Sequence, residues 1–194
     1  GIVIIASLAA YAFSRLKFPG KNIFFIIFIA AMMIPIPGSF VALYVLLNKL
    51  HLRDTPIGYI LAMINVGLSV SIFLLKTFFD KIPMELEDAA RIDGCSKLGI
   101  WWHVALPLAR PVLAVIVVFN ALTVWNEYIL ALIIFDSRGF MPLQVAIKLF
   151  QGEFVTNYPL LMAGLTIAAL PIILVYLLMQ KYIQRGIISQ AVYG

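Results

Sequence analysis

Long apolar runs separated by short charged segments dominate this chain. Of its 194 residues, 63% are hydrophobic and only 12% are charged, and the mean hydropathy is +1.05. A water-soluble domain carries about a quarter charged residues, whereas a bilayer core about 30 Å thick needs about 20 apolar residues per spanning helix. The pattern therefore predicts an integral membrane protein.

The apolar runs predict an all-α, polytopic membrane helix bundle, with residues 1–194 forming one transmembrane domain. About five helices are expected, over residues 1–13, 22–47, 57–75, 109–135 and 158–182. The first run measures about 20 Å at 1.5 Å per residue, too short to cross the bilayer, so we expect a truncated helix there. Pro35, Pro37 and Gly38 predict a break in the second helix.

Basic residues are concentrated on one side of the predicted bundle. That side holds ten of them: Arg15, Lys17, Lys21, Lys76, Lys81, Arg91, Lys97, Arg110, Lys181 and Arg185. The other side holds four: Lys49, Arg53, Arg138 and Lys148. The positive-inside rule then places the loop at residues 80–110 and the C-terminus in the cytoplasm. The first helix runs inward, which implies one further helix before Gly1 and six in the full chain.

The outer loop at residues 136–157 is long enough for structure of its own. An apolar pattern follows Pro142, formed by Leu143, Val145, Ala146, Leu149 and Phe150. We expect a short amphipathic helix lying at the membrane interface.

Several classes of function are excluded by composition. Cys95 is the single cysteine and His51 and His103 are far apart, so no disulfide, metal site or histidine-based enzyme site is expected. The net charge of +5 is spread over short loops, which suits membrane lipid rather than nucleic acid. Gly20-Lys21 lacks the rest of a phosphate-binding loop, so the chain itself should bind no ATP or other cofactor.

The cytoplasmic loop at residues 80–110 does not fit a simple bundle. Pro83 and the acidic residues Glu85, Glu87 and Asp88 predict a helix start, and Gly94 predicts its end after Asp93. Ser96 is expected to cap a second helix that continues to about Ala105 and stops at Pro107. The apolar groups Leu86, Ala89, Ala90 and Ile92 favour docking into a groove on a soluble partner. The alternative is an amphipathic elbow at the lipid surface.

The spacing in this loop resembles the signature loop of importer permeases of the ATP-binding cassette (ABC) family. The family pattern is Glu-Ala-Ala, three residues, Gly, nine residues, then Ile-x-Leu-Pro. Here it reads Asp88-Ala89-Ala90, Gly94 and Val104-Ala105-Leu106-Pro107, with conservative changes at Asp88 and Val104. The wider loop, Trp125-Asn126-Glu127-Tyr128 and Gln184-Arg185-Gly186 resemble the carbohydrate-uptake branch.

The resemblance implies a sugar or oligosaccharide permease subunit in the inner or plasma membrane, not an enzyme. Its implied partners are a second permease subunit, two cytoplasmic ATPase subunits that bind the ATP, and an extracytoplasmic solute-binding protein. The loop would be the coupling helix that sits on one ATPase. The implied coupling residues are Glu85, Glu87, Asp88, Ala89, Ala90, Gly94, Leu106 and Pro107.

Polar residues within the apolar runs are candidates for the solute path, because polar groups in a membrane face a bundle interior or a wet cavity. Asn120, Thr123 and Glu127 share one helical face within about 60°, with Asn120 nearest mid-depth. The full candidate set is Asn65, Ser69, Asn120, Thr123, Trp125, Asn126 and Glu127. Two alternatives remain: interhelical hydrogen bonds that only hold the bundle, and for Glu127 an outer-loop charge.

Two other functions are consistent with a membrane bundle. One is a permease of the same family for a different solute. The other is an ion-coupled secondary transporter that uses Glu127, although paired intramembrane acids would be expected there and the chain has one at most. A membrane-bound enzyme would need clustered His, Asp or Glu, which the sequence does not offer.

Overall fold

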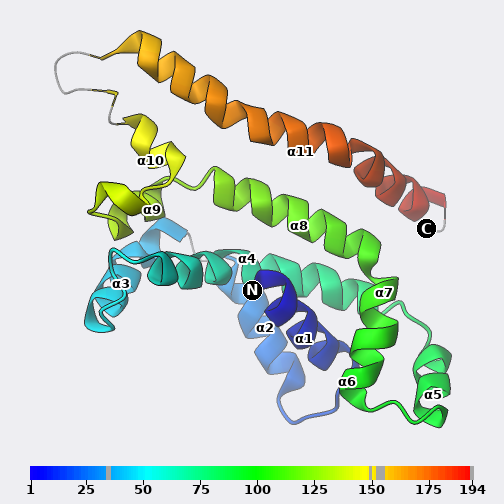
Figure 1. Ribbon diagram of the computed structural model, residues 1–194. Coiled ribbons are helices and arrows are strands. Elements are labelled where there is room, and N and C mark those ends of the chain that lie inside the picture. The colour runs from blue at the N-terminus through cyan, green and yellow to red at the C-terminus, as the bar shows by residue number, and fades with distance from the viewer. Residues whose placement is uncertain (34–35, 149, 152–155, 193–194) are drawn as a thin grey trace. The chain divides into compact units, whose positions relative to one another are not determined.

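The computed structural model describes residues 1–33, 36–148, 150–151 and 156–192. Helices α1 to α4 are Ile2–Arg15, Lys21–Ala31, Ile36–Lys49 and Pro56–Phe79. The segments α5, α6, η1 and α7 are Met84–Ile92, Lys97–Ile100, Trp101–Ala105 and Leu106–Leu108. The remaining segments α8, α9, η2, α10 and α11 are Arg110–Trp125, Ile129–Ile134, Arg138–Phe140, Leu143–Lys148 and Tyr158–Val192 (Figure 1). The predicted all-α fold is confirmed.

Two helices in the described part of the chain are long and apolar enough to cross a membrane unaided. They are α4 and the stretch Tyr158–Leu178 of α11. A third span is possible if the Lys97–Leu108 stretch and α8 are counted together, although they are bent by 79°. Helices α1 and α2 and the stretch Gly38–Lys49 of α3 are apolar but shorter.

Two of the predicted spans are broken, one where the sequence predicts a break and one predicted to be continuous. The second predicted span divides into α2 and α3, and residues 34–35 between them lie outside the described residues. The fourth predicted span divides into α8 and α9 at residues 126–128. The first break agrees with the proline signal, whereas the second has no proline and depends on side-chain capping, as shown below.

The chain forms two compact units. Unit 1 contains residues 1–34, 64–117 and 185–194, and unit 2 contains residues 35–63 and 118–184.

The core of unit 1 is built around α1, the second half of α4 and the α6–η1 segment. Ala6 and Ala10 are fully buried on α1, and small residues of this kind let membrane helices approach closely. Tyr11 meets Phe79 edge to face with ring centroids 6.0 Å apart. Phe13 contacts three other rings, those of Phe18, Phe25 and Phe28, which packs α2 against α1.

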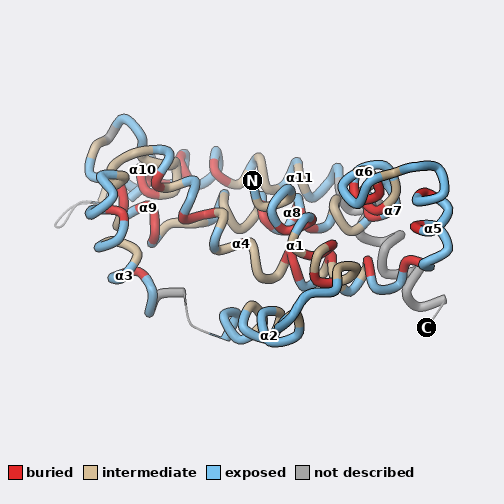
Figure 2. Tube along the Cα trace, turned by 90° about the horizontal axis from the view of Figure 1, so that it is seen from below, coloured by how far each residue is buried: buried red, intermediate tan, exposed pale blue. Residues whose placement is uncertain are grey.

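The core of unit 2 gathers the outer helices. Phe135 and Val145 are buried with Tyr59 packed against them, and Ile147 packs with Leu161 of α11. The short helix expected after Pro142 is confirmed as α10, with Val145 and Ile147 on its buried face; Leu149 lies outside the described residues. Figure 2 shows buried positions in short stretches of several helices and none in α2, while much of the trace is exposed. Such exposed apolar surface suits lipid or partner subunits.

Candidate functional site

The loop at residues 80–110 folds into the two short helical segments that the sequence predicts. Helix α5 begins after Pro83 and has Glu85 and Glu87 in its first turn. At its end the N–H of Cys95 donates to the carbonyl of Ala90 at 2.9 Å, and the N–H of Gly94 to that of Arg91 at 3.0 Å. This paired closure requires a left-handed residue, and Gly94 has a φ of +83°. The glycine stop is confirmed.

The second segment differs from the prediction at its end. Ser96 caps it as expected, because Gly99 N–H donates to Ser96 Oγ at 3.2 Å. The helix does not stop at Pro107, however, but continues through a π-helical turn, η1, into α7 and bends at Ala109. Pro107 has no N–H to donate to the preceding turn, and the residues before it, Trp101–Ala105, form the wider π-helical turn.

One face of α5 is exposed and mixes acidic and apolar groups. Glu85, Leu86, Asp88, Ala89 and Ile92 are all exposed, and Ile92 reaches 86%. Among the described residues, the carboxylate of Asp88 pairs only with Arg91 of the same helix, at 2.7 Å. We call these five residues the outer face of α5. An 86% exposed isoleucine beside acidic groups suits a docking surface.

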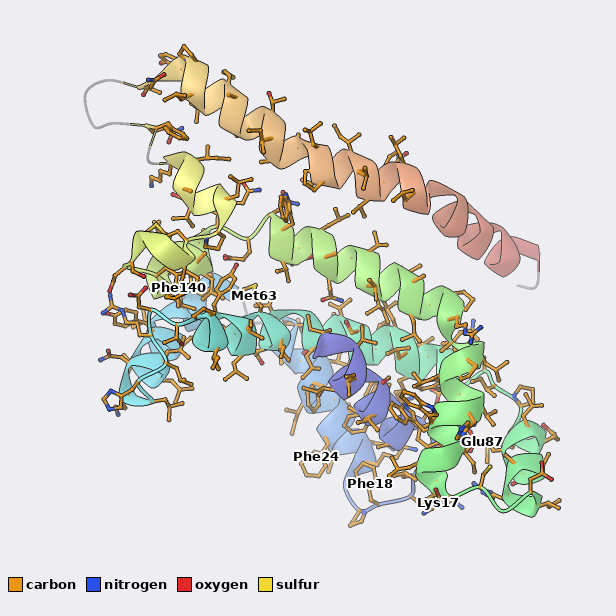
Figure 3. The ribbon with its side chains drawn as sticks, viewed as in Figure 1. Lys17, Phe18, Phe24, Met63, Glu87 and Phe140 are labelled. Carbon is orange, nitrogen blue, oxygen red and sulfur yellow. The ribbon has the colours of Figure 1, made fainter. Side chains whose placement is uncertain are left out.

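The other face of α5 is buried, and it includes two residues that the sequence analysis grouped with the coupling surface. Ala90 is 8% exposed and Glu87 is 1% exposed. Figure 3 shows Glu87 on the side of α5 that faces the rest of unit 1, where its Oε1 lies 2.6 Å from Nε of Arg15. Glu87 therefore faces inward. Leu106 is half-buried and Pro107 exposed on α7.

The predicted polar stripe on α8 does not present one uniform open face. Asn120 is 7% exposed, so its amide is buried within the chain. Thr123 is half-buried, and its hydroxyl donates to the carbonyl of Phe119 at 2.9 Å. Local back-bonding of this kind satisfies a hydroxyl in an apolar helix without any solute.

The Trp125-Asn126-Glu127 segment ends α8 and begins α9. Trp125 Nε1 donates to the carbonyl of Ala168 on α11 at 3.0 Å, and Asn126 Nδ2 donates to the carbonyl of Leu122 at 2.8 Å. Glu127 accepts from the N–H groups of Leu130 and Ala131 at 2.6 and 2.9 Å. A carboxylate in this position satisfies the free donors of a helix start and favours the helix dipole.

Because Glu127 caps α9, we expect Glu127→Ala to lower the stability of the protein by about 1 to 2 kcal/mol. Glu127→Gln keeps one acceptor oxygen and should lose less. Thermal unfolding of the purified membrane protein in detergent checks this order. Equal stability of all three proteins would mean that the cap contributes nothing, and a solute-facing role would then become the better explanation.

A second polar pair lies on α4, in unit 1. Asn65 is exposed and Ser69, one turn further along, is half-buried. Asn65 is the tenth residue of the 24-residue helix α4, so it lies near mid-depth of the span. An exposed amide at that depth must face a wet cavity or a partner helix rather than lipid.

An outer-loop contact in unit 2 was not foreseen from the sequence. Asp54 has a φ of +54°, and its Oδ1 accepts from the N–H groups of Asp136 and Ser137 at 3.1 and 3.0 Å. Arg53 pairs with the Asp136 carboxylate. These bonds fasten the loop before α4 to the segment after α9.

Hydrogen bonding from the Ser137 backbone lowers the pKa of Asp54 below its ordinary 3.8. Because the pKa of Asp54 is lower in the folded protein than in the unfolded chain, the contact contributes its full stability at pH values above 3.8. This stability is lost as the pH falls through the pKa of Asp54 in the folded protein. We therefore expect slow amide exchange at Ser137 at neutral pH and faster exchange in strong acid. Asp54→Ala should show the faster exchange at neutral pH as well; unchanged exchange in that variant would contradict the contact.

The sequence alone did not predict the contacts of three residues, Arg15, Asp54 and Tyr59. Arg15 was counted only as a cytoplasmic charge, although its place at the end of an apolar helix is where an arginine can bond helix-end carbonyls. Tyr59 donates to Glu127 at 3.4 Å, and its spacing in α4 gives no signal of that partner.

The described residues combine apolar helices long enough to cross a membrane with an exposed helix–glycine–helix loop. Residues 2–189 match the family of binding-protein-dependent transport system inner membrane components. The chain belongs to this family, a family of transport permeases.

Relatives and solved structures agree with this assignment. An ABC transporter permease protein of Caldicellulosiruptor sp. (strain Rt8B.4) is 39% identical over 193 residues, which cover 100% of this chain and 70% of the relative. The arabinooligosaccharides transport system permease protein AraQ of Bacillus subtilis (strain 168) is 30% identical, with 99% of this chain and 68% of the relative covered. A crystal structure of a bacterial ABC transporter involved in the import of the acidic polysaccharide alginate matches with a TM-score of 0.78 and 28% identity, covering 93% of this chain and 70% of that one.

Proposed function

We propose that this chain is the permease subunit of an ATP-driven importer for a sugar or oligosaccharide. It forms half of the translocation path with a second permease subunit, receives solute from an extracytoplasmic binding protein, and is driven by two cytoplasmic ATPase subunits that bind the ATP. The carbohydrate specificity is supported by the relatives whose names refer to oligosaccharide or polysaccharide transport.

The observation that carries the proposal is the outer face of α5. A nine-residue helix stopped by a left-handed glycine presents Ile92 and the neighbouring acidic groups to the exterior. An amphipathic helix of this kind fits a groove on a partner, and Asp88 and Glu85 would steer it toward basic groups there. We propose that the groove belongs to an ATPase subunit.

The direct test is uptake by the complete complex in proteoliposomes. The full-length chain would be combined with the second permease, the ATPase and the binding protein, and labelled arabino-oligosaccharides would be the first probe. We expect accumulation that requires both ATP and the binding protein. Accumulation driven by an ion gradient without ATP would instead support a secondary transporter, with Glu127 as its candidate site.

The loop at residues 80–110 and the C-terminus are proposed to be cytoplasmic, on the basis of ten basic residues against four. Reporter fusions after Arg110 and after Arg138 should therefore report opposite sides of the membrane. The same location for both fusions would contradict this topology.

For the solute path we propose the Asn65 and Ser69 face of α4. An exposed mid-depth amide must be satisfied by water, solute or a partner helix, and the amide and hydroxyl suit the hydroxyl groups of a sugar. The burial of Asn120 and the capping bonds of Glu127 support packing roles for those two residues.

A further inference from the structure

One arginine joins three segments of unit 1 beneath the outer face of α5. Arg15, the last residue of α1, has its Nε 2.6 Å from Oε1 of Glu87 on α5. One of its terminal nitrogens, Nη2, donates to the carbonyl of Phe79, the last residue of α4, at 2.6 Å. The other, Nη1, lies 3.0 Å from the sulfur of Met84. The contacts of a single side chain therefore link α1, α4 and α5.

Both charges of this ion pair are buried, so each needs its partner. The side chains of Arg15 and Glu87 are 8% and 1% exposed. A buried charge is costly without its partner, so the loss of either one is destabilising. Glu87 also has a longer ion pair, because Nη2 of Arg91 lies 3.8 Å from its Oε2. The planar guanidinium has five donors in a fixed fork, which lets it serve a carboxylate and helix-end carbonyls together. The carbonyl of Phe79, at the end of α4, also accepts from the N–H of Ile82 at 3.1 Å, and Nη2 of Arg15 donates to the carbonyl of Ile82 at 2.5 Å.

Three further contacts lie at the same junction. Tyr11 Oη donates to Oε2 of Glu87 at 3.4 Å. Ser14 Oγ donates to Oδ1 of Asp80 at 2.7 Å, and Lys76 Nζ lies 2.6 Å from Oδ2 of the same carboxylate. The ends of α1 and α4 are thus joined to each other as well as to α5.

Besides this junction, α5 is held by the segment at residues 80–83, where the N–H groups of Lys81 and Ile82 donate to the carbonyls of Phe78 and Phe79 at 3.0 and 3.1 Å. Its buried Ala90 also lies in the apolar core of unit 1, but these contacts include no charged side chain. The outer face offers no restraint of its own, since Asp88 bonds only within α5 in the described contacts.

We propose that Arg15 and Glu87 are positioning residues that transmit displacement of α5 to α1 and α4. When a partner moves the outer face, the buried pair makes the three helix ends move as one body. The inference rests on the proposed function, because it assumes that α5 receives the movement of an ATPase. Glu87 is thereby given a role separate from that of its neighbour Asp88, which faces the partner.

The test measures a coupling ratio, the solute imported per ATP hydrolysed, in the complete reconstituted complex. Glu87→Gln keeps the shape of the side chain and removes its charge. We expect this variant to assemble and hydrolyse ATP while its coupling ratio falls about tenfold or more, the effect of losing about 1.4 kcal/mol of restraint. Lys81→Gln is the control, because it removes an exposed charge from the neighbouring segment at residues 80–83, and its ratio should equal that of the unmodified complex.

A second variant decides the case in which Glu87→Gln fails to assemble. Arg15→Lys keeps the buried charges balanced, but one ammonium cannot reproduce the fork that serves Glu87 and Phe79 together. We expect an assembled complex with a lowered coupling ratio. An unchanged ratio in either assembled variant would overturn the inference, and so would failure of both variants to assemble, which would assign the pair to folding alone.

The two proposals fail in different ways. If the unmodified complex shows no ATP-dependent uptake, the proposed function is contradicted. If the unmodified complex imports solute and the variants couple equally well, only the inference about Arg15 and Glu87 is contradicted.

Discussion

Replacing Gly94 with valine should reduce uptake by the complete complex at least tenfold while the protein still inserts in the membrane. The φ of Gly94 is +83°, a region that a β-branched residue adopts only at high cost. Apart from its two chain neighbours, no atom of the described residues lies within 4 Å of the position that a Cβ would take. The expected defect therefore arises from the backbone conformation and not from a clash, and it should change the direction in which the outer face of α5 points.

A second variant, Gly94→Asn, separates the effect of the backbone conformation from that of adding a side chain. Asparagine tolerates the left-handed conformation better than other side-chain-bearing residues, and the open space around Gly94 accommodates it. Gly94→Asn should keep most of the uptake that Gly94→Val loses. Uptake and co-purification of the ATPase would be measured together. Normal transport by Gly94→Val, or equal loss in both variants, would contradict the requirement for a left-handed turn.

The second large effect is a loss of uptake expected from replacing Asn65 with leucine. The same replacement at Asn120 should affect stability instead. Asn65→Leu should lower uptake about tenfold or more in a complex of normal yield, because a lost hydrogen bond to a hydroxylated solute corresponds to about 1 to 3 kcal/mol. Asn120→Leu should instead lower thermal stability, by about 0.6 to 1.7 kcal/mol, because its amide is 7% exposed within the chain.

The comparison is decisive because only the surroundings of the two amides differ. Uptake at a fixed amount of assembled complex and the unfolding temperature would be measured for both variants. If Asn120→Leu abolishes uptake at normal stability and Asn65→Leu has no effect, the path follows α8, as the sequence pattern alone suggested.

Much of the fold could be predicted because membrane insertion imposes strong rules on sequence. Runs of about 20 apolar residues identified α4 and α11, and the glycine and serine signals located the end of α5 and the start of α6. These features depend on local chemistry that a sequence displays directly. The break at residues 126–128 was missed because a carboxylate cap, and not a proline or glycine, produces it.

The site was predicted less completely than the fold because sequence does not show which way a side chain faces. Glu85, Glu87 and Asp88 look alike as acidic residues at a helix start, yet Glu87 is 1% exposed while the other two are exposed. Its partner Arg15 lies 72 positions earlier in the chain. A contact over that separation follows from tertiary packing and has no local signature.

The central claim is that the outer face of α5 docks on an ATPase subunit, and site-specific photocrosslinking in native membranes tests it most directly. A photoreactive amino acid would replace Ile92, which is 86% exposed, and in a control protein Ile57, which is 63% exposed at the start of α4. The account predicts an adduct with the ATPase polypeptide from position 92 and none from position 57. Adducts with lipid alone at position 92, or the same ATPase adduct from both positions, would contradict it.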